Sequence, residues 1–233
     1  MNACLSITSL YMVKQRIGSG AGWIILFLFT CFFSGCATKP PHENGNFRQT
    51  ELVELIKLDP GFRLDIRYAT GNNLAGRPVY QEARAFLQKP AAIALVKVND
   101  QLKQLGYGLL IFDGYRPWSV TKLFWDITPD ENKRFVADPK KGSKHNRGCA
   151  VDLSMYDLAS GKEIEMTGIY DEMSERSYPY YTGGTEMQRR MRDLLRTTME
   201  ANGFKVYEFE WWHFDYQDWP YYRITNVPFS KIK

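Results

Sequence analysis

Hydrophobic residues recur at helical spacing in two long segments of the chain. Between Pro90 and Gly106, apolar positions follow one another every three or four residues, which predicts a helix over residues 91–105 that begins after the proline and ends at the glycine. Between Thr185 and Gly203, a stripe of methionine and leucine at the same spacing predicts a second helix. We expect this second stripe to face the hydrophobic core.

Other segments have the patterns of β-strands. Residues 62–68 alternate between apolar and polar side chains, and residues 108–112 form the short apolar run of a buried strand. Residues 149–155 and 205–214 are expected to be further strands, with a shorter helix over residues 118–125. Because strands and helices are mixed without regular β–α alternation, the sequence predicts a single α+β domain with a central antiparallel sheet flanked by helices.

Composition changes this picture little. A length of 233 residues suits one domain, and the formal net charge of +4 comes from scattered lysines and arginines, which gives no indication of nucleic-acid binding. Two polar stretches, residues 128–142 and 157–184, are expected to be loops. The second is long enough to have a function of its own.

The N-terminal segment has the features of a secretory signal. Lys14 and Arg16 precede an apolar run over residues 22–33, about a dozen residues, whereas a membrane-spanning helix needs about 20. A basic start, a short apolar run and an exit of small residues predict a signal peptide over residues 1–35. Met12 is an alternative start that gives a signal of more usual length.

The exit from the apolar run resembles the bacterial lipobox, in which cleavage precedes a cysteine that then carries lipid. Here that cysteine is Cys36. We expect a lipoprotein on the periplasmic side of a bacterial cell envelope, with residues 36–50 as a Pro-rich linker and residues 51–233 as the folded domain. An uncleaved anchor and an ordinary signal cut near Ala37 are the alternatives. Cys149 then has no partner, unless it forms a bridge with Cys36.

Only two histidines lie in the expected domain, and each has carboxylates nearby. His145 precedes Asp152 by seven residues, and Glu210 precedes His213 by three. Two imidazoles, one carboxylate and a spare carboxylate are the components of a catalytic zinc site. We expect His145 on a loop that enters the strand of Asp152. Residues three apart in a flat strand face opposite sides, so Glu210 and His213 can share a site only if their strand ends, twists or bulges.

Longer motifs around these residues point to one family. The pattern S-x-H-x-x-G-x-A-x-D over residues 143–152, followed by E-x-W-H over residues 210–213, resembles the paired signature of the D-alanyl-D-alanine dipeptidases. These are the vancomycin-resistance-type enzymes of the zinc D,D-peptidase and Hedgehog-like superfamily. Residues 68–78, 113–117 and 171–177 are similar to the same enzymes. The resemblance covers nearly the whole expected domain and implies the fold of that superfamily.

The resemblance also implies a role for each matching residue. His145, Asp152 and His213 would hold one zinc ion per chain. Glu210 would be the general base that takes a proton from the attacking water and passes it to the leaving amine. Arg116 would stabilise the oxyanion of the tetrahedral intermediate.

The resemblance places a substrate-binding group beside the metal. Asp171, Ser143 and Tyr68 match the residues that hold the free amino group of the dipeptide, and a carboxylate suits an ammonium. The predicted function is therefore zinc-dependent hydrolysis of D-Ala-D-Ala in cell-wall dipeptide turnover. The alternatives are a peptidoglycan D,D- or L,D-carboxypeptidase and a non-catalytic zinc-binding module. Cys149 departs from the family pattern; a small buried residue is the simpler interpretation, and the alternative is a thiol that makes the site sensitive to oxidation.

Overall fold

The computed structural model describes residues 12–16, 23–27 and 39–233, which fall into two compact units divided between Thr38 and Lys39. In the first unit, β1 (Met12–Arg16) pairs antiparallel with β2 (Trp23–Phe27). Most of the predicted signal, and Cys36, lie outside the described residues. No helix in the described part of the chain is long and apolar enough to cross a membrane.

A five-stranded sheet in the order β4-β6-β7-β9-β8 is the centre of the second unit. Its strands are β4 (Arg63–Leu64), β6 (Tyr107–Asp113), β7 (Ala150–Asp157), β8 (Phe204–Tyr207) and β9 (Glu210–Tyr216). All neighbours are antiparallel except β4 and β6, which pair in parallel at one edge because a helical crossover joins them. The predicted α+β fold with a mainly antiparallel sheet is confirmed.

Two long helices cover the sheet. The helix α2 (Lys89–Lys103) packs on β6, α4 (Glu186–Glu200) packs on β8, and the two helices also contact each other. Thr185 caps α4 in a capping box with Gln188, as the pattern of a helix start predicts. Most of the apolar positions of both helices face the core, where Leu95 and Leu195 are fully buried, but Ile93 and Met187 in the first turns are 46% and 60% exposed. Both predicted long helices are confirmed.

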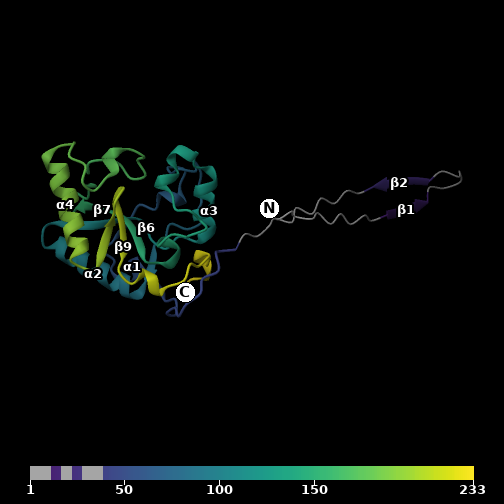
Figure 1. Cartoon of the computed structure of the whole chain (residues 1–233), viewed down its shortest axis with the longest axis horizontal. Coiled ribbons are helices and arrows are strands. Elements are labelled where there is room, and N and C mark those ends of the chain that lie inside the picture. The colour runs from purple at the N-terminus through teal and green to yellow at the C-terminus, as the bar shows by residue number, and fades with distance from the viewer. Residues whose placement is uncertain (1–11, 17–22, 28–38) are drawn as a thin grey trace. The chain divides into compact units, whose positions relative to one another are not determined.

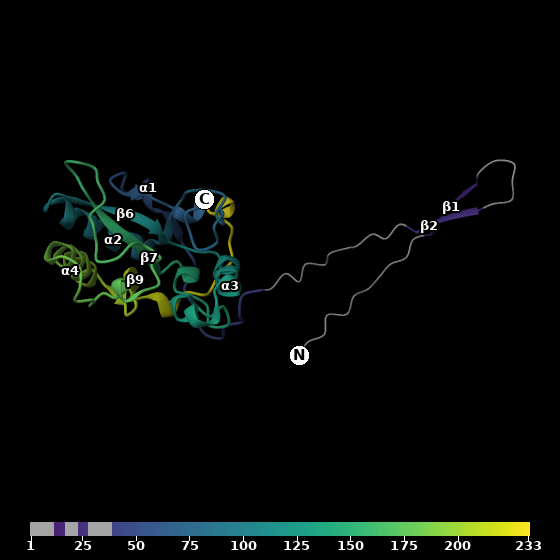
Figure 2. The ribbon, with the colours of Figure 1, turned by 90° about the horizontal axis from the view of Figure 1, so that it is seen from above.

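The remaining elements surround this sheet. A short helix α1 (Leu55–Leu58) follows β3 (Leu52–Glu54), which pairs antiparallel with β5 (Phe86–Gln88). The helix α3 (Trp118–Ile127) lies at the opposite end of the unit from α4 (Figure 1) and is seen from above in Figure 2. Six single 3₁₀ segments complete the unit: Arg67–Ala69, Asp130–Phe135, His145–Arg147, Glu175–Ser177, Trp219–Tyr221 and Phe229–Lys231.

Two of the predicted strands differ from the structure. In the stretch 62–68 only Arg63 and Leu64 pair in the sheet, because the chain then turns and the Tyr68 carbonyl accepts backbone hydrogen bonds from Val79 and Tyr80. The stretch 205–214 is not one strand but the hairpin of β8 and β9. In both cases the alternation of apolar and polar residues continues through a turn, so the pattern does not show where the strand ends.

Residues 39–50 have no helix or strand, yet they differ from the expected linker because they pack onto the domain. Glu43 accepts a hydrogen bond from the buried Arg147 and another, of 2.7 Å, from the backbone of Ile224. The backbone of Arg48 donates to Tyr221 over 2.8 Å. A segment with these partners is part of the folded unit, which therefore begins earlier than residue 51.

Candidate metal centre and substrate pocket

His145 lies on a 3₁₀ turn that leads into β7, as predicted. The turn ends at Gly148 in the left-handed conformation (φ 69°), and a Cβ atom there would come within 2.5 Å of Leu52. The buried amide of Asn146 fixes the turn, since it donates to the Arg116 carbonyl over 2.9 Å and to Thr121 over 2.8 Å. The imidazole is thus held on a rigid support.

Asp152 and His213 face each other on neighbouring strands, β7 and β9. On its other side β9 is irregular: Val206 of β8 pairs with Phe214, but the next residue of β8 pairs with Glu210. The intervening residues of β9 therefore bulge, and the Glu210 carboxylate reaches within 3.8 Å of His213 Nδ1. The predicted irregularity is confirmed, and it brings the Glu210 carboxylate next to the His213 imidazole.

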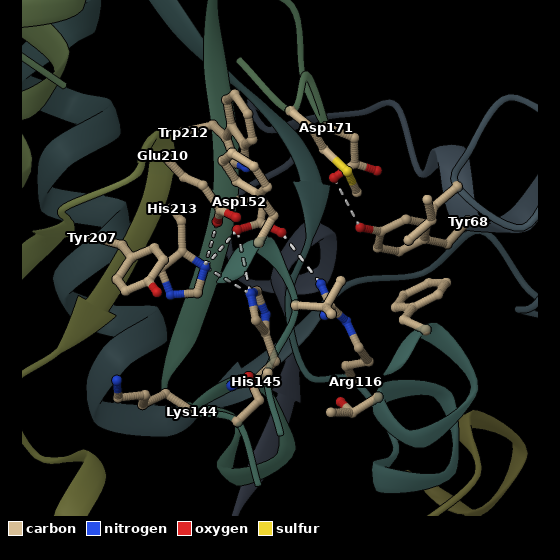
Figure 3. A pocket seen from close by; sticks show the side chains of 18 of the residues that line it. Tyr68, Arg116, Lys144, His145, Asp152, Asp171, Tyr207, Glu210, Trp212 and His213 are labelled. Atoms are coloured by element: carbon tan, nitrogen blue, oxygen red, sulfur yellow. Dashed lines mark hydrogen bonds and ion pairs between the residues drawn. The ribbon is translucent and has the colours of Figure 1, made fainter. Parts of the chain in front are cut away.

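Three ligand atoms converge on one point. His145 Nε2 lies 3.0 Å from His213 Nδ1 and 3.3 Å from Asp152 Oδ1, and that oxygen lies 2.9 Å from His213 Nδ1 (Figure 3). Zinc bonds of roughly 2.0–2.1 Å at tetrahedral angles separate ligand atoms by about 3.3 Å, so the triangle fits one zinc ion with little adjustment. Metal-binding side chains are those of histidine, cysteine, aspartate and glutamate. Among the described residues, these three are the one set of such side chains close enough together to hold a metal.

Each ligand is oriented by a second hydrogen bond. His145 Nδ1 donates to the Gly114 carbonyl over 2.7 Å, which leaves Nε2 free to bind a metal. His213 Nε2 donates to Asp215 over 2.9 Å, which leaves Nδ1. The Tyr170 hydroxyl donates to Asp152 Oδ2 over 3.1 Å, so that the other oxygen faces the histidines. Such partners set the tautomer and raise the basicity of metal-binding histidines.

The electrostatics of this group favour a cation. Burial alone would raise the pKa of Asp152, but His145 and His213 outweigh it and hold that pKa well below its usual range. Burial alone would lower the pKa of His213, but Asp215 and Asp152 outweigh it and raise that pKa to about 10. The carboxylates around these buried side chains thus favour the binding of a positive charge.

Glu210 and Arg116 flank the ligands on two sides. Burial raises the pKa of Glu210 to about 8, against the opposing attraction of His213. Arg116 Nη2 lies 2.9 Å from Asp113 and 3.4 Å from Asp152, and its guanidinium lies over the rings of Tyr68 and Phe124, at 5.2 Å and 5.3 Å from their centroids. A carboxyl group with a pKa near neutrality and a fixed cation therefore adjoin the three converging side chains.

The three residues predicted to hold an ammonium line the same pocket, and two of them contact each other. The Tyr68 hydroxyl donates to Asp171 over 3.2 Å, and Ser143 Oγ accepts from the His145 backbone over 3.2 Å. Asp171 is in the left-handed conformation at φ 62°, a strained geometry for a residue with a side chain. Burial, reinforced by Asp152, raises the pKa of Asp171 to about 7.

All eight residues assigned to the site from the sequence line a single pocket. They share it with Trp212, Lys144 and other side chains, around a cavity of about 150 Å³. Pockets for drug-sized ligands occupy roughly 300–1,000 Å³, so this cavity suits a small substrate. The ninth assigned residue, Cys36, lies outside the described residues.

The structure adds residues that the sequence reasoning missed. Asp113 belongs to a recognised motif, but its contact with Arg116 is visible only in three dimensions. Asp215 lies two positions after His213 on the same strand, a spacing that places both on one face and is in retrospect a usable signal. Tyr170 had no such signal, since it precedes Asp171 in a loop.

Cys149 is the small buried residue that the sequence suggests, and it lacks the reactivity of the alternative interpretation. The thiol is free and fully buried beside the site, and burial raises its pKa to about 12. Almost none of it is thiolate at neutral pH, and the thiolate is the form that oxidises and binds metals. Cys149 is a small core residue.

Comparison with known proteins adds a consistent result. The Peptidase_M15 family model, described as D-ala-D-ala dipeptidase, matches residues 48–231. A D-alanyl-D-alanine dipeptidase of Escherichia coli (strain K12) is 36% identical over 181 residues, which are 78% of this chain and 92% of that protein. One of Enterococcus faecalis is 37% identical over 182 residues (69% and 89%). One of Enterococcus faecium is 35% identical over 188 residues (72% and 92%).

A solved structure of a vancomycin-resistance D,D-pentapeptidase in complex with Zn(II) matches more distantly. It has 16% identity and a TM-score of 0.38 over 57% of this chain and 74% of that chain.

Proposed function

The chain belongs to the Peptidase_M15 family of D-Ala-D-Ala dipeptidases, which are zinc metallopeptidases, and from this we propose that its pocket hydrolyses the D-Ala-D-Ala dipeptide. One observation carries the proposal. The three ligand atoms of His145, Asp152 and His213 converge within 3.3 Å of one another. The partly buried side chains of Glu210, Arg116 and Asp171 lie around them in the same pocket.

We assign one zinc ion per chain to these three residues. When bound there, zinc supplies an activated water at neutral pH and polarises the carbonyl of the scissile bond. The donor set, two imidazoles and one carboxylate, is that of catalytic zinc sites with an open fourth position. Hydrogen bonds accepted by Gly114 and Asp215 and donated by Tyr170 hold the ligands in place.

Glu210 moves the proton in this scheme. Its carboxylate lies beside His213 and its pKa of about 8 is near that of a base working at neutral pH. We propose that it takes a proton from the attacking water and gives it to the nitrogen of the leaving D-alanine. Without this transfer the amine would have to leave as an anion.

Arg116 meets the negative charge that develops on the carbonyl oxygen. Its guanidinium is fixed by Asp113, which in turn accepts hydrogen bonds from Tyr80 and the Gly114 backbone. A donor that is already oriented needs no reorganisation during the reaction.

Asp171 selects for a free amino group. We propose that the substrate ammonium pairs with its carboxylate, with Tyr68 and Ser143 as further partners. A longer peptide has an uncharged amide at that position, which would leave the buried carboxylate without a counter-charge.

A substrate comparison tests this assignment. The zinc-loaded chain should hydrolyse D-Ala-D-Ala and fail on N-acetyl-D-Ala-D-Ala, because acetylation removes the ammonium. Preference for the acetylated peptide would contradict the dipeptidase assignment and favour a carboxypeptidase.

The cellular location is a separate proposal that rests on the sequence. We propose that the protein is exported and anchored to a membrane by lipid on Cys36, and that it recycles dipeptides released from cell wall. The variant C36A should then leave the membrane fraction. Retention of C36A in that fraction would point to an uncleaved anchor.

A further inference from the structure

The substrate assigned above has two charged ends, and the residues discussed so far bind only one of them. Asp171 pairs with the ammonium, while Glu210 and Arg116 act on the peptide bond between the two residues. The C-terminal carboxylate of a dipeptide lies on the far side of that bond. A pocket that binds it well offers a cation there.

Two cationic side chains other than histidine line the pocket in the described part of the chain, Arg116 and Lys144. Arg116 is already engaged, since its Nε and Nη2 contact Asp113 and its Nη2 contacts Asp152. Lys144 has one ionic contact, 3.3 Å from Asp215, and its side chain is 35% exposed. An ammonium has three donors, so two remain for a ligand.

Lys144 also lies at the end of the pocket opposite Asp171. Lys144 contacts Asp215, which accepts a hydrogen bond from His213, so Lys144 lies on the His213 side of the pocket. Asp171 contacts Tyr68, whose ring lies beside the Arg116 guanidinium, so Asp171 lies on the Arg116 side. Figure 3 shows Lys144 and Asp171 on opposite sides of the three ligands. A dipeptide that runs from one to the other passes the ligands with its peptide bond.

We propose that Lys144 binds the free C-terminal carboxylate of the substrate and thereby restricts the enzyme to substrates that end in a carboxylate one residue beyond the scissile bond. This inference rests on the proposed function and extends it to a second specificity-determining residue. The backbone of Lys144 immediately precedes His145 on the fixed 3₁₀ turn, so the ammonium is attached to the same support as a ligand.

A purely structural role makes a different prediction. If Lys144 serves only to hold Asp215, its loss weakens His213 as a ligand and affects every substrate equally. If Lys144 binds the carboxylate, its loss affects only substrates that have one. The C-terminal amide of D-Ala-D-Ala keeps the ammonium and the peptide bond but lacks that negative charge.

The test measures kcat and KM of the zinc-loaded full chain, together with its zinc content, on D-Ala-D-Ala and on its C-terminal amide. The wild type is compared with K144M, K144R and the matched control K141M, which removes an exposed lysine three residues away. We expect K144M to raise KM for the free acid roughly 10- to 100-fold while kcat and zinc content stay unchanged, since a lost charge-assisted hydrogen bond acts on binding. KM for the amide should change little, K144R should recover part of the loss, and K141M should match the wild type.

Two results would overturn the inference. Equal losses on both substrates with reduced zinc content would show that Lys144 acts through Asp215, and an unchanged KM for the free acid would show that it does not bind the carboxylate. A zinc-loaded wild type that hydrolyses neither substrate would instead overturn the proposed function, and the inference with it.

Discussion

At the scale of single residues, three acids that line one pocket differ in charge because their neighbours differ. Burial raises the pKa of all three, but at Asp152 two histidines outweigh it and hold the carboxylate ionised. Glu210 and Asp171 lack comparable partners, and their pKa values rise to about 8 and about 7. A permanent anion suits a metal ligand, and acids that titrate near neutrality suit proton transfer and ammonium binding.

The variant E210Q tests the proton-transfer role. The glutamine keeps the shape of the side chain but accepts no proton, so kcat should fall by roughly 10²- to 10⁴-fold. Zinc content should stay at one per chain, because Glu210 is not among the three converging ligands. Steady-state kinetics with zinc analysis measure both quantities, and full activity of E210Q would exclude Glu210 as the base.

The charge of Asp171 predicts a pH dependence of substrate binding. The carboxylate is ionised above a pKa of about 7, so kcat/KM for D-Ala-D-Ala should decrease as the pH falls through 7. In D171N the value should be low throughout, and only the decrease that belongs to Glu210, whose pKa is about 8, should remain. A decrease of the same size in D171N would assign the titration to another group.

The same acid predicts a gain in stability when it is removed. Because the folded pKa of Asp171 lies above its ordinary value of 3.8, the ionised form costs stability that grows as the pH rises from about 4 to about 7. D171N should therefore raise the free energy of unfolding at pH 8, by at most about 4 kcal/mol, and leave it nearly unchanged at pH 4. Denaturant titrations at the two pH values measure the difference, and a loss of stability at pH 8 would contradict this account.

At the scale of elements, the site depends on two irregularities: the glycine that ends the His145 turn and the bulge in β9. The variant G148A tests the first. It combines a positive φ with a Cβ atom that would overlap Leu52, so it should destabilise the protein by more than about 1–2 kcal/mol and weaken zinc binding. The control G161A has a similar φ of 70° but a nearest neighbour at 3.4 Å. It should cost only the backbone strain and leave zinc affinity unchanged.

The elements were predictable where periodicity is long and where turn residues mark the ends. The helices α2 and α4 and the buried strands β6 and β7 agree with the sequence pattern because each buries one regular face or a whole run. The sequence pattern did not divide β8 from β9, because the turn between them contains no glycine or proline and the alternation of apolar and polar residues continues into β9. Local sequence patterns thus predict that a helix or strand exists better than they predict where it ends.

The site shows the same division between local and distant information. That His145, Asp152, His213 and Glu210 belong to one site could be predicted because each histidine lies a few residues from a carboxylate. Arg116 and Asp171 required resemblance to a family, because no spacing links them to His145. Asp113 and Asp215 lie within three residues of their partners Arg116 and His213, but no motif marked those contacts in the sequence. Lys144 contacts Asp215 on β9, a pairing that only the folded chain brings together.

At the scale of the whole molecule, the domain extends toward the N-terminus beyond its predicted boundary. Glu43 is the counter-charge of the buried Arg147, which follows His145 by two residues. E43A should lower the free energy of unfolding by about 1–3 kcal/mol, because it leaves a buried cation unpaired. The exposed neighbour Asn44 supplies the control N44A, which should have no effect. Equal stability of E43A and the wild type would show that residues 39–50 are a passive linker.

The central claim is that one metal ion, held by His145, Asp152 and His213, makes this chain a dipeptidase. Removal and restoration of metal tests it most directly, with hydrolysis of D-Ala-D-Ala and bound zinc measured on the same samples. Chelation should abolish hydrolysis, and added zinc should restore it in proportion to occupancy, reaching its maximum at one zinc per chain. Hydrolysis that persists in the metal-free chain, or a fully loaded chain that leaves D-Ala-D-Ala intact, would contradict the account.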